Sequence, residues 1–122
     1  MMDNIAKESQ NQVQFDTYKK RQVKLGPYTT YIWNNDPKHL LFILSRYKFV
    51  AKMLDGKKDV LEIGVGDAFG VPIVAQTVER IHGVDWESLL LKDNRERLSE
   101  VNCTFECLDI TKEKPSGLYD AA

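Results

Sequence analysis

The stretch from Asp59 to Gly70, DVLEIGVGDAFG, decides how the rest of the sequence is interpreted. An apolar run of strand length is followed by Gly64, Gly66 and Gly70. Glycines that come after a strand and before a helix let a ligand approach the backbone without a Cβ in the way. In a doubly wound sheet this position is the carboxyl end of a strand, where ligands bind. A tight turn without a ligand stays open as an alternative.

The segments around this stretch alternate between strand and helix patterns. Strands are predicted at 60–63, 80–85 and 103–108, and the opening of a fourth at 118–122. Helices are predicted at 15–23, 37–54, 70–79 and 86–101. Strands that alternate with helices imply a parallel sheet with right-handed crossovers. We therefore expect an α/β, Rossmann-like sheet of about four strands at 37–122, preceded by a tail and leading segment at 1–36.

The helix predicted after Pro37 carries the longest apolar stripe. Asp36 is a candidate N-terminal cap, and proline suits the first helical position. Apolar residues surround much of the helix, so we expect it to be well buried; they include Leu40, Leu41, Phe42, Ile43, Leu44, Tyr47, Phe49, Val50, Met53 and Leu54. Residues 28–33 favour neither helix nor strand, and residues 1–13 are typical of a mobile tail.

Composition argues against several classes of protein. The formal net charge is −1, which leaves no electrostatic footprint for nucleic acid or an anionic membrane. No apolar stretch approaches the ~18 residues of a membrane span, and the N-terminus lacks the apolar core of a signal peptide. We therefore expect a cytoplasmic protein. Cys103 and Cys107 lie too far apart along one predicted strand to bridge, so we expect two buried thiols and no metal site.

Acidic residues end the second and third predicted strands. Asp85 follows Gly64 by about twenty residues, the spacing of an acid that binds ribose hydroxyls. Asp109 can accept a hydrogen bond from an exocyclic amine such as adenine N6. Three strand ends thus outline a site for an adenosine-containing ligand. Both aspartates could instead cap the helices that follow them.

Further acids around the glycine turn narrow the choice of ligand. The dinucleotide fingerprint G-x-G-x-x-G fails, because Phe69 stands where its third glycine belongs. Glu62 and Asp67 flank the turn and would repel a pyrophosphate. They suit a ligand with a cationic end, such as S-adenosylmethionine with its ammonium and sulfonium groups. An NAD-dependent oxidoreductase is therefore the less favoured alternative.

Three motifs in order resemble those of class I S-adenosylmethionine-dependent methyltransferases. VLEIGVGDAFG is similar to the first motif of this family, GVDWE to the second and CLDI to the third. The resemblance covers residues 57–122 and implies the seven-stranded sheet order 3-2-1-4-5-7-6. This chain corresponds to about half of that sheet, so we expect an N-terminal portion of a methyltransferase that is truncated relative to the full fold.

The resemblance implies a role for each residue of the glycine turn. Glu62 would orient the turn or the methionine amino group, unless it caps a neighbouring helix. Gly64 and Gly66 would pass under the methionine and the ribose. Ala68 stands where many family members have a third glycine, so the turn here must accommodate a methyl group.

The other two motifs would hold the adenosine. Asp85 would bind the ribose hydroxyls, and Trp86 would pack on the adenine unless it belongs to the core. Asp109 would accept from adenine N6, and Ile110 would supply a backbone N–H to the ring.

The resemblance leaves the methyl acceptor and the catalytic residues unidentified. We expect that the chain alone is inactive and that it forms a homo-oligomer through the outer edge of its fourth strand, because unpaired edges tend to find another chain. A non-catalytic module that binds S-adenosylmethionine or self-associates is the alternative.

Overall fold

A computed structural model describes residues 5–122 and contains a parallel sheet with the strand order β1-β2-β3. Its strands are β1 (Asp59–Ile63), β2 (Arg80–Asp85) and β3 (Cys103–Cys107). The helices are α1 (Gln12–Lys20), α2 (Pro27–Asn35), α3 (His39–Met53), α4 (Val71–Ala75) and α5 (Ser88–Arg97). The expected α/β class and the parallel, Rossmann-like sheet are therefore confirmed.

The last residues of the chain lie along the free edge of β1. Ala121 forms a parallel bridge with Val60, and its carbonyl accepts from the Leu61 N–H at 2.9 Å. The opening of the expected fourth strand is thus a single bridge, on the side of β1 opposite β2. This placement gives the order 3-2-1-4 that the resemblance implies.

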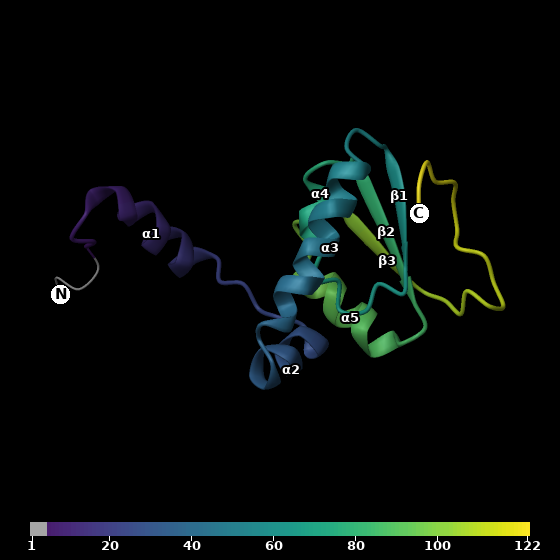
Figure 1. Ribbon diagram of the computed structural model, residues 1–122, viewed down its shortest axis with the longest axis horizontal. Coiled ribbons are helices and arrows are strands. Elements are labelled where there is room, and N and C mark those ends of the chain that lie inside the picture. Colours follow the sequence, from purple (N-terminus) through teal and green to yellow (C-terminus); the bar gives the residue numbers. More distant parts are fainter. Residues whose placement is uncertain (1–4) are drawn as a thin grey trace.

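The two faces of the sheet are covered differently (Figure 1). Helices α3, α4 and α5 pack on one face, where Val60, Ile81 and Phe105 form a core with residues of the helices. The segment after β3 runs along the other face, where Tyr119 packs on a smaller cluster of Leu61, Val84 and Leu108. Glycine turn and strand ends meet at the lower edge of the sheet in this view.

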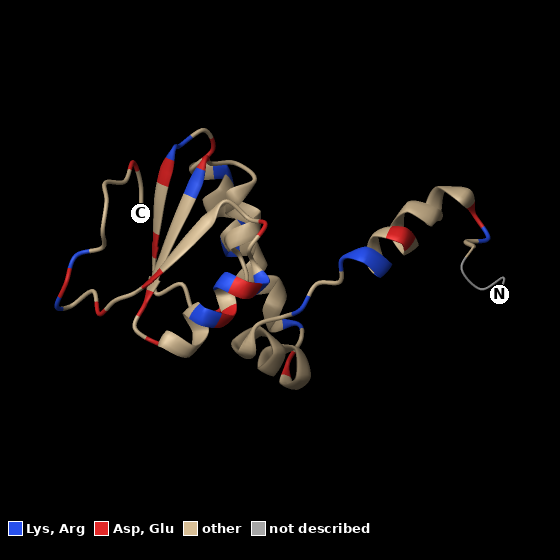
Figure 2. Ribbon diagram, turned by 180° about the vertical axis from the view of Figure 1, so that it is seen from behind, with Lys and Arg blue, Asp and Glu red and all other residues tan. Residues whose placement is uncertain are grey.

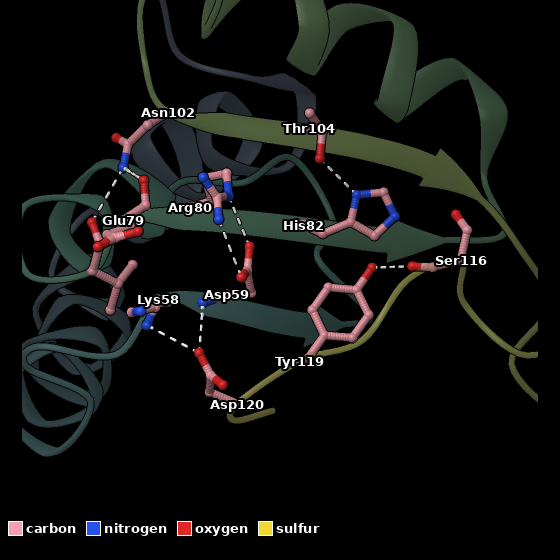
Figure 3. A network of polar contacts seen from close by, with 11 residues as sticks. Lys58, Asp59, Glu79, Arg80, His82, Asn102, Thr104, Ser116, Tyr119 and Asp120 are labelled. Carbon is pink, nitrogen blue, oxygen red and sulfur yellow. Dashed lines mark hydrogen bonds and ion pairs between the residues drawn. The ribbon is translucent and has the colours of Figure 1, made fainter.

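Polar contacts tie the second face together (Figure 3). His82 on β2 contacts Thr104 through Nδ1 at 2.7 Å and Glu106 through Nε2 at 2.9 Å. Its ring stacks on Tyr119 with 5.9 Å between the centroids, and the Tyr119 hydroxyl donates to the Ser116 carbonyl. These contacts hold the C-terminal segment against the sheet.

The prediction that α3 is well buried is wrong. Only one side of this helix reaches the core, through Leu40 and Ala51. More than half of the surface of Leu41, Phe42, Phe49 and Met53 is exposed. The apolar stripe runs around the helix as expected, but no described element covers its outer side.

Several element boundaries differ from expectation for local reasons. Asp36 does not cap α3; it follows the end of α2, and its carbonyl accepts from the His39 N–H at 3.0 Å. Helix α4 ends at Ala75 rather than at residue 79, and the Thr77 carbonyl accepts from the Gly56 N–H instead of continuing the helix. Residues 28–33, which favoured neither state, form most of α2.

Differences also occur near the two ends of the chain. Helix α1 begins at Gln12, so residues 12 and 13 are helical rather than part of a tail. Residues 1–4 of the predicted tail lie outside the described residues. The expectation of two buried thiols is wrong, because Cys107 is exposed and Cys103 is only half-buried. In the part of the chain described, no helix is long and apolar enough to cross a membrane.

Candidate functional site

The ends of the three strands border one cavity of about 340 Å³. Five of the eight predicted site residues line it, namely Gly64, Asp85, Trp86, Asp109 and Ile110. Its other walls are Ile63, Val84, Leu108 and Thr111. The cavity combines apolar walls with two carboxylates, a composition typical of small-molecule sites.

The glycine turn borders this cavity through Gly64, and its backbone conformation favours glycine at two positions. Gly64 has φ +70° and Gly66 has φ +59°, a left-handed conformation that side chains rarely adopt. A Cβ on Gly64 would meet no atom within 4 Å, so open space lies beside this residue. A ligand can therefore approach the Gly64 backbone closely.

Ala68 adopts the same left-handed conformation without being glycine. Its φ is +58°, and its side chain is fully buried. The methyl group expected from the sequence is thus accommodated, at a cost of about 1–2 kcal/mol in backbone strain.

Asp85 links the glycine turn to the end of β2. Its Oδ2 accepts from the Gly66 N–H at 2.9 Å and its Oδ1 from the Glu87 N–H at 3.1 Å. Asp85 does not cap α5, because Glu87 occupies the N-cap position. Each carboxylate oxygen can accept a second hydrogen bond, so Asp85 keeps capacity for a ligand hydroxyl.

Trp86 and Asp109 both line the cavity. Trp86 is 77% exposed, so the alternative that it belongs to the core is wrong. Asp109 Oδ1 accepts from the N–H and the hydroxyl of Thr111, and these bonds lower the pKa of its carboxyl. No helix follows Asp109 within residues 110–122, so Asp109 caps a turn and not a helix. Ile110 is partly exposed beside it.

Glu62 lies on the other side of Gly64, in a second cavity of about 680 Å³ between α3 and β1. Its Oε2 accepts from the Tyr47 hydroxyl at 2.8 Å, so its partner is a tyrosine rather than a helix terminus. Burial raises the pKa of the Glu62 carboxyl to about 7, although the Tyr47 hydrogen bond acts in the opposite direction. Gly64 lines both cavities, so the two adjoin at the turn.

Asp67 contacts a different part of the molecule from the one that the sequence suggested. Its buried carboxylate accepts from the Thr29 N–H at 2.7 Å and from the Thr29 hydroxyl at 3.1 Å. It thereby caps the first turn of α2, and Tyr28 of that helix lies over Gly66. A direct role of Asp67 toward a ligand stays a prediction.

Sequence reasoning missed two residues of α5 whose side chains donate hydrogen bonds to carbonyl groups of the glycine turn. Asn94 is fully buried, and its side chain donates to the Gly66 carbonyl at 2.8 Å. Arg97 donates to the Asp67 carbonyl at 2.7 Å and to Asn94 Oδ1 at 2.7 Å. The sequence contains one signal for this contact. Asn94 stands three residues after Leu91, on the inner side of the predicted helix, and a polar residue at such a position indicates a buried side chain with a hydrogen-bond partner.

Charges elsewhere on the molecule are mixed. Basic and acidic residues are interspersed along α5, and the strands carry both signs (Figure 2). Within residues 5–122, no group of three or more His, Cys, Asp or Glu side chains is placed to hold a metal ion.

Comparison with known proteins identifies the fold. No family model matches the chain, and no curated protein matches it. The solved structure of the N-methyltransferase NodS from Bradyrhizobium japonicum WM9 in complex with S-adenosyl-L-homocysteine is similar, with a TM-score of 0.56 and 15% identity over 86% of this chain and 52% of that one. Coclaurine N-methyltransferase, bound to N-methylheliamine and S-adenosylhomocysteine, gives a TM-score of 0.58 and 20% identity over 96% of this chain and 42% of that one.

A protein of another activity shares the fold. The [4+2]-cyclase SpnF matches with a TM-score of 0.51 and 21% identity, over 62% of this chain and 32% of that one. The chain thus spans about half or less of the length of these three structures. It has the Rossmann-like fold of class I methyltransferases, and the fold alone does not determine the reaction.

Proposed function

We propose that this chain is the S-adenosylmethionine-binding portion of a methyltransferase. The observation that carries the proposal is the cavity at the strand ends, which is lined by Asp85, Trp86 and Asp109. In this proposal the Asp85 carboxylate binds the ribose hydroxyls, the exposed indole of Trp86 packs on the adenine, and the Asp109 carboxylate accepts a hydrogen bond from adenine N6. The open side of Gly64 connects this cavity with the carboxylate of Glu62. A ligand with adenosine at one end and a cationic amino acid at the other fits this order of groups.

The hydrogen bonds of the glycine turn argue against a dinucleotide. A pyrophosphate binds to free backbone N–H groups at a helix N-terminus. Here the Gly64 and Val65 N–H groups donate to the Val84 carbonyl, and the Gly66 N–H donates to Asp85. The helix that follows is only five residues long. The turn therefore offers few donors to a phosphate, and Glu62 adds a repelling charge.

For methyl transfer, this part of the chain would bind and orient the cofactor. Reaction of an acceptor with the sulfonium methyl depends strongly on positioning. The cavity next to Glu62 has walls that include the exposed side chains of Phe49, Met53 and Ile63, so water reaches it. We therefore propose that the 122 residues alone do not transfer methyl groups.

A non-catalytic module is the second candidate function. The shared fold of the cyclase supports it, because that fold serves more than one activity. We further propose that the chain works in the cytoplasm and that it self-associates through the outer edge of its fourth-strand segment and the exposed apolar surface near that edge. This surface consists of Leu41, Phe42, Phe49, Met53 and Ile63, each more than half exposed.

Calorimetric titration of the chain with S-adenosylmethionine, S-adenosylhomocysteine and NAD tests the cofactor. We expect the two adenosyl amino acids to bind in preference to NAD. Tighter binding of NAD would contradict the proposal. Incubation with methyl-labelled S-adenosylmethionine then tests whether the chain alone is inactive. Binding without turnover agrees with both candidate functions, and turnover would contradict the inactivity of the chain alone.

A further inference from the structure

Tyr47 touches both ends of the glycine turn, although it belongs to α3. Its hydroxyl donates to Glu62, the acid that precedes the turn, at 2.8 Å. Burial and the nearby Glu62 carboxylate raise the pKa of Tyr47, so the hydroxyl keeps its proton and acts as the donor. The contact spans 15 residues of sequence and joins a helix to a strand end.

The ring of Tyr47 explains why residue 70, the last residue of the turn, is glycine. A Cβ on Gly70 would lie 2.0 Å from the ring atoms Cγ and Cδ2 of Tyr47, far inside van der Waals contact. Gly70 has φ −89°, which any residue adopts, so its backbone conformation does not require glycine. The ring therefore occupies the space where a side chain at position 70 would be.

We propose that Tyr47 is a positioning residue that holds the Glu62 carboxylate beside the glycine turn, where it receives the cationic end of the cofactor. The ring fixes the far end of the turn through Gly70, and the hydroxyl fixes the orientation of Glu62. This inference rests on the proposed function, because it assigns a ligand to Glu62. That Tyr47 orients Glu62 rests only on two contacts, the hydrogen bond of its hydroxyl to Glu62 and the packing of its ring against Gly70.

Few charged side chains lie close enough to interact with the Glu62 carboxylate. Arg46 lies next to Tyr47 on α3 and lines the same cavity, but the contact of the Glu62 carboxylate is with the Tyr47 hydroxyl. Asp67 acts on Tyr47 electrostatically, while its own carboxylate bonds Thr29. A cationic ligand group would thus meet a carboxylate whose hydrogen bond to Tyr47 favours the ionised form, since that bond lowers the pKa of Glu62.

The Tyr47→Phe variant tests this inference because it keeps the ring and removes the hydroxyl. Two quantities are measured between pH 6 and pH 9: the titration of the Glu62 side-chain carboxyl by carbon-detected NMR without ligand, and the affinity for S-adenosylhomocysteine. We expect the Glu62 midpoint to rise by about one pH unit, the effect of one lost hydrogen bond to a charged group. The affinity should then be about fivefold weaker at pH 7 and match that of the parent chain at pH 9.

Tyr18→Phe is the matched control, because Tyr18 is exposed on α1; it should change neither quantity. A merely structural role of Tyr47 would weaken binding equally at every pH and leave the Glu62 titration in place, and that result would overturn the inference. A shifted titration with an affinity ratio that does not vary with pH would overturn the link to the ligand. If S-adenosylhomocysteine binds neither protein, the proposed function fails, while the Glu62 titration still decides the role of Tyr47.

Discussion

Replacement of Glu62 by glutamine is expected to stabilise the fold at neutral and alkaline pH. Burial raises the pKa of this carboxyl from 4.5 to about 7, so the folded chain binds a proton that the unfolded chain releases. Stability from this group is therefore fully present below about pH 4.5 and is lost as the pH rises through about 7. Glutamine has the same length and can accept the hydrogen bond from Tyr47, but it does not ionise.

The two pKa values set the size of the effect. The pKa of Glu62 is 4.5 in the unfolded chain and about 7 in the folded chain, and each pKa unit corresponds to about 1.36 kcal/mol. Ionisation of Glu62 in the folded chain therefore lowers the free energy of unfolding by about 3 kcal/mol. Because Glu62 keeps some contact with solvent, we expect a measured value of about 2–3 kcal/mol. The same substitution removes the charge that the proposed cofactor needs, so stability and binding should change in opposite directions.

Urea unfolding followed by circular dichroism at pH 4, 6 and 8 measures this difference. The variant and the parent chain should be about equally stable at pH 4, and the variant should be more stable by about 2–3 kcal/mol at pH 8. Glu96→Gln, at an exposed position on α5, controls for the loss of one negative charge. A difference that is the same at all three pH values, or a less stable Glu62→Gln variant at pH 8, would refute the argument from burial.

Three other predictions concern the cofactor, the turn and the apolar surface. Asp85→Ala should weaken S-adenosylhomocysteine binding at least about 100-fold in calorimetry, because two hydrogen bonds to a charged acceptor contribute about 1.5–3 kcal/mol each; Asp55→Ala, at an exposed acid, should leave it unchanged. Equal binding by both variants would mean that Asp85 serves only to hold Gly66. Gly70→Ala should lower the free energy of unfolding by about 1–3 kcal/mol through overlap with Tyr47, and much less in a Tyr47→Ala background; additive effects would disprove that contact. Light scattering should detect a dimer or larger species that the exposed face of α3 holds together, and a monomer at every concentration would exclude it.

The sheet and the strand ends could be predicted because their signals are local. The strand at 80–85 was predicted with its observed bounds, since Ile81 and Val84 are apolar and acidic Asp85 ends the run. Positions of the glycines and acids at the strand ends followed from the parallel order. Each strand of a parallel sheet brings its carboxyl end to the same edge, so the sequence spacing carries over into space.

The features that the sequence did not predict, namely helix α2, the exposed side of α3 and the contacts of Tyr47, depend on contacts between residues far apart in the sequence. The aromatic and β-branched residues of α2 form a helix whose first turn is capped by Asp67, a residue 38 positions away from Thr29. Helix periodicity indicated the apolar stripe of α3, but periodicity does not say which elements cover a stripe. Tyr47 belonged to that stripe, and nothing in its spacing pointed to Glu62 or Gly70.

An NMR titration of the chain with S-adenosylhomocysteine tests the central proposal most directly, because it locates the ligand. We expect the largest shifts of amide signals at Gly64, Gly66 and Ile110 and of the indole signal of Trp86, the groups around the two adjoining cavities. Signals of His82 and Tyr119, on the other face of the sheet, should stay in place. Shifts confined to that face, or none at millimolar ligand, would contradict an S-adenosylmethionine site at the strand ends.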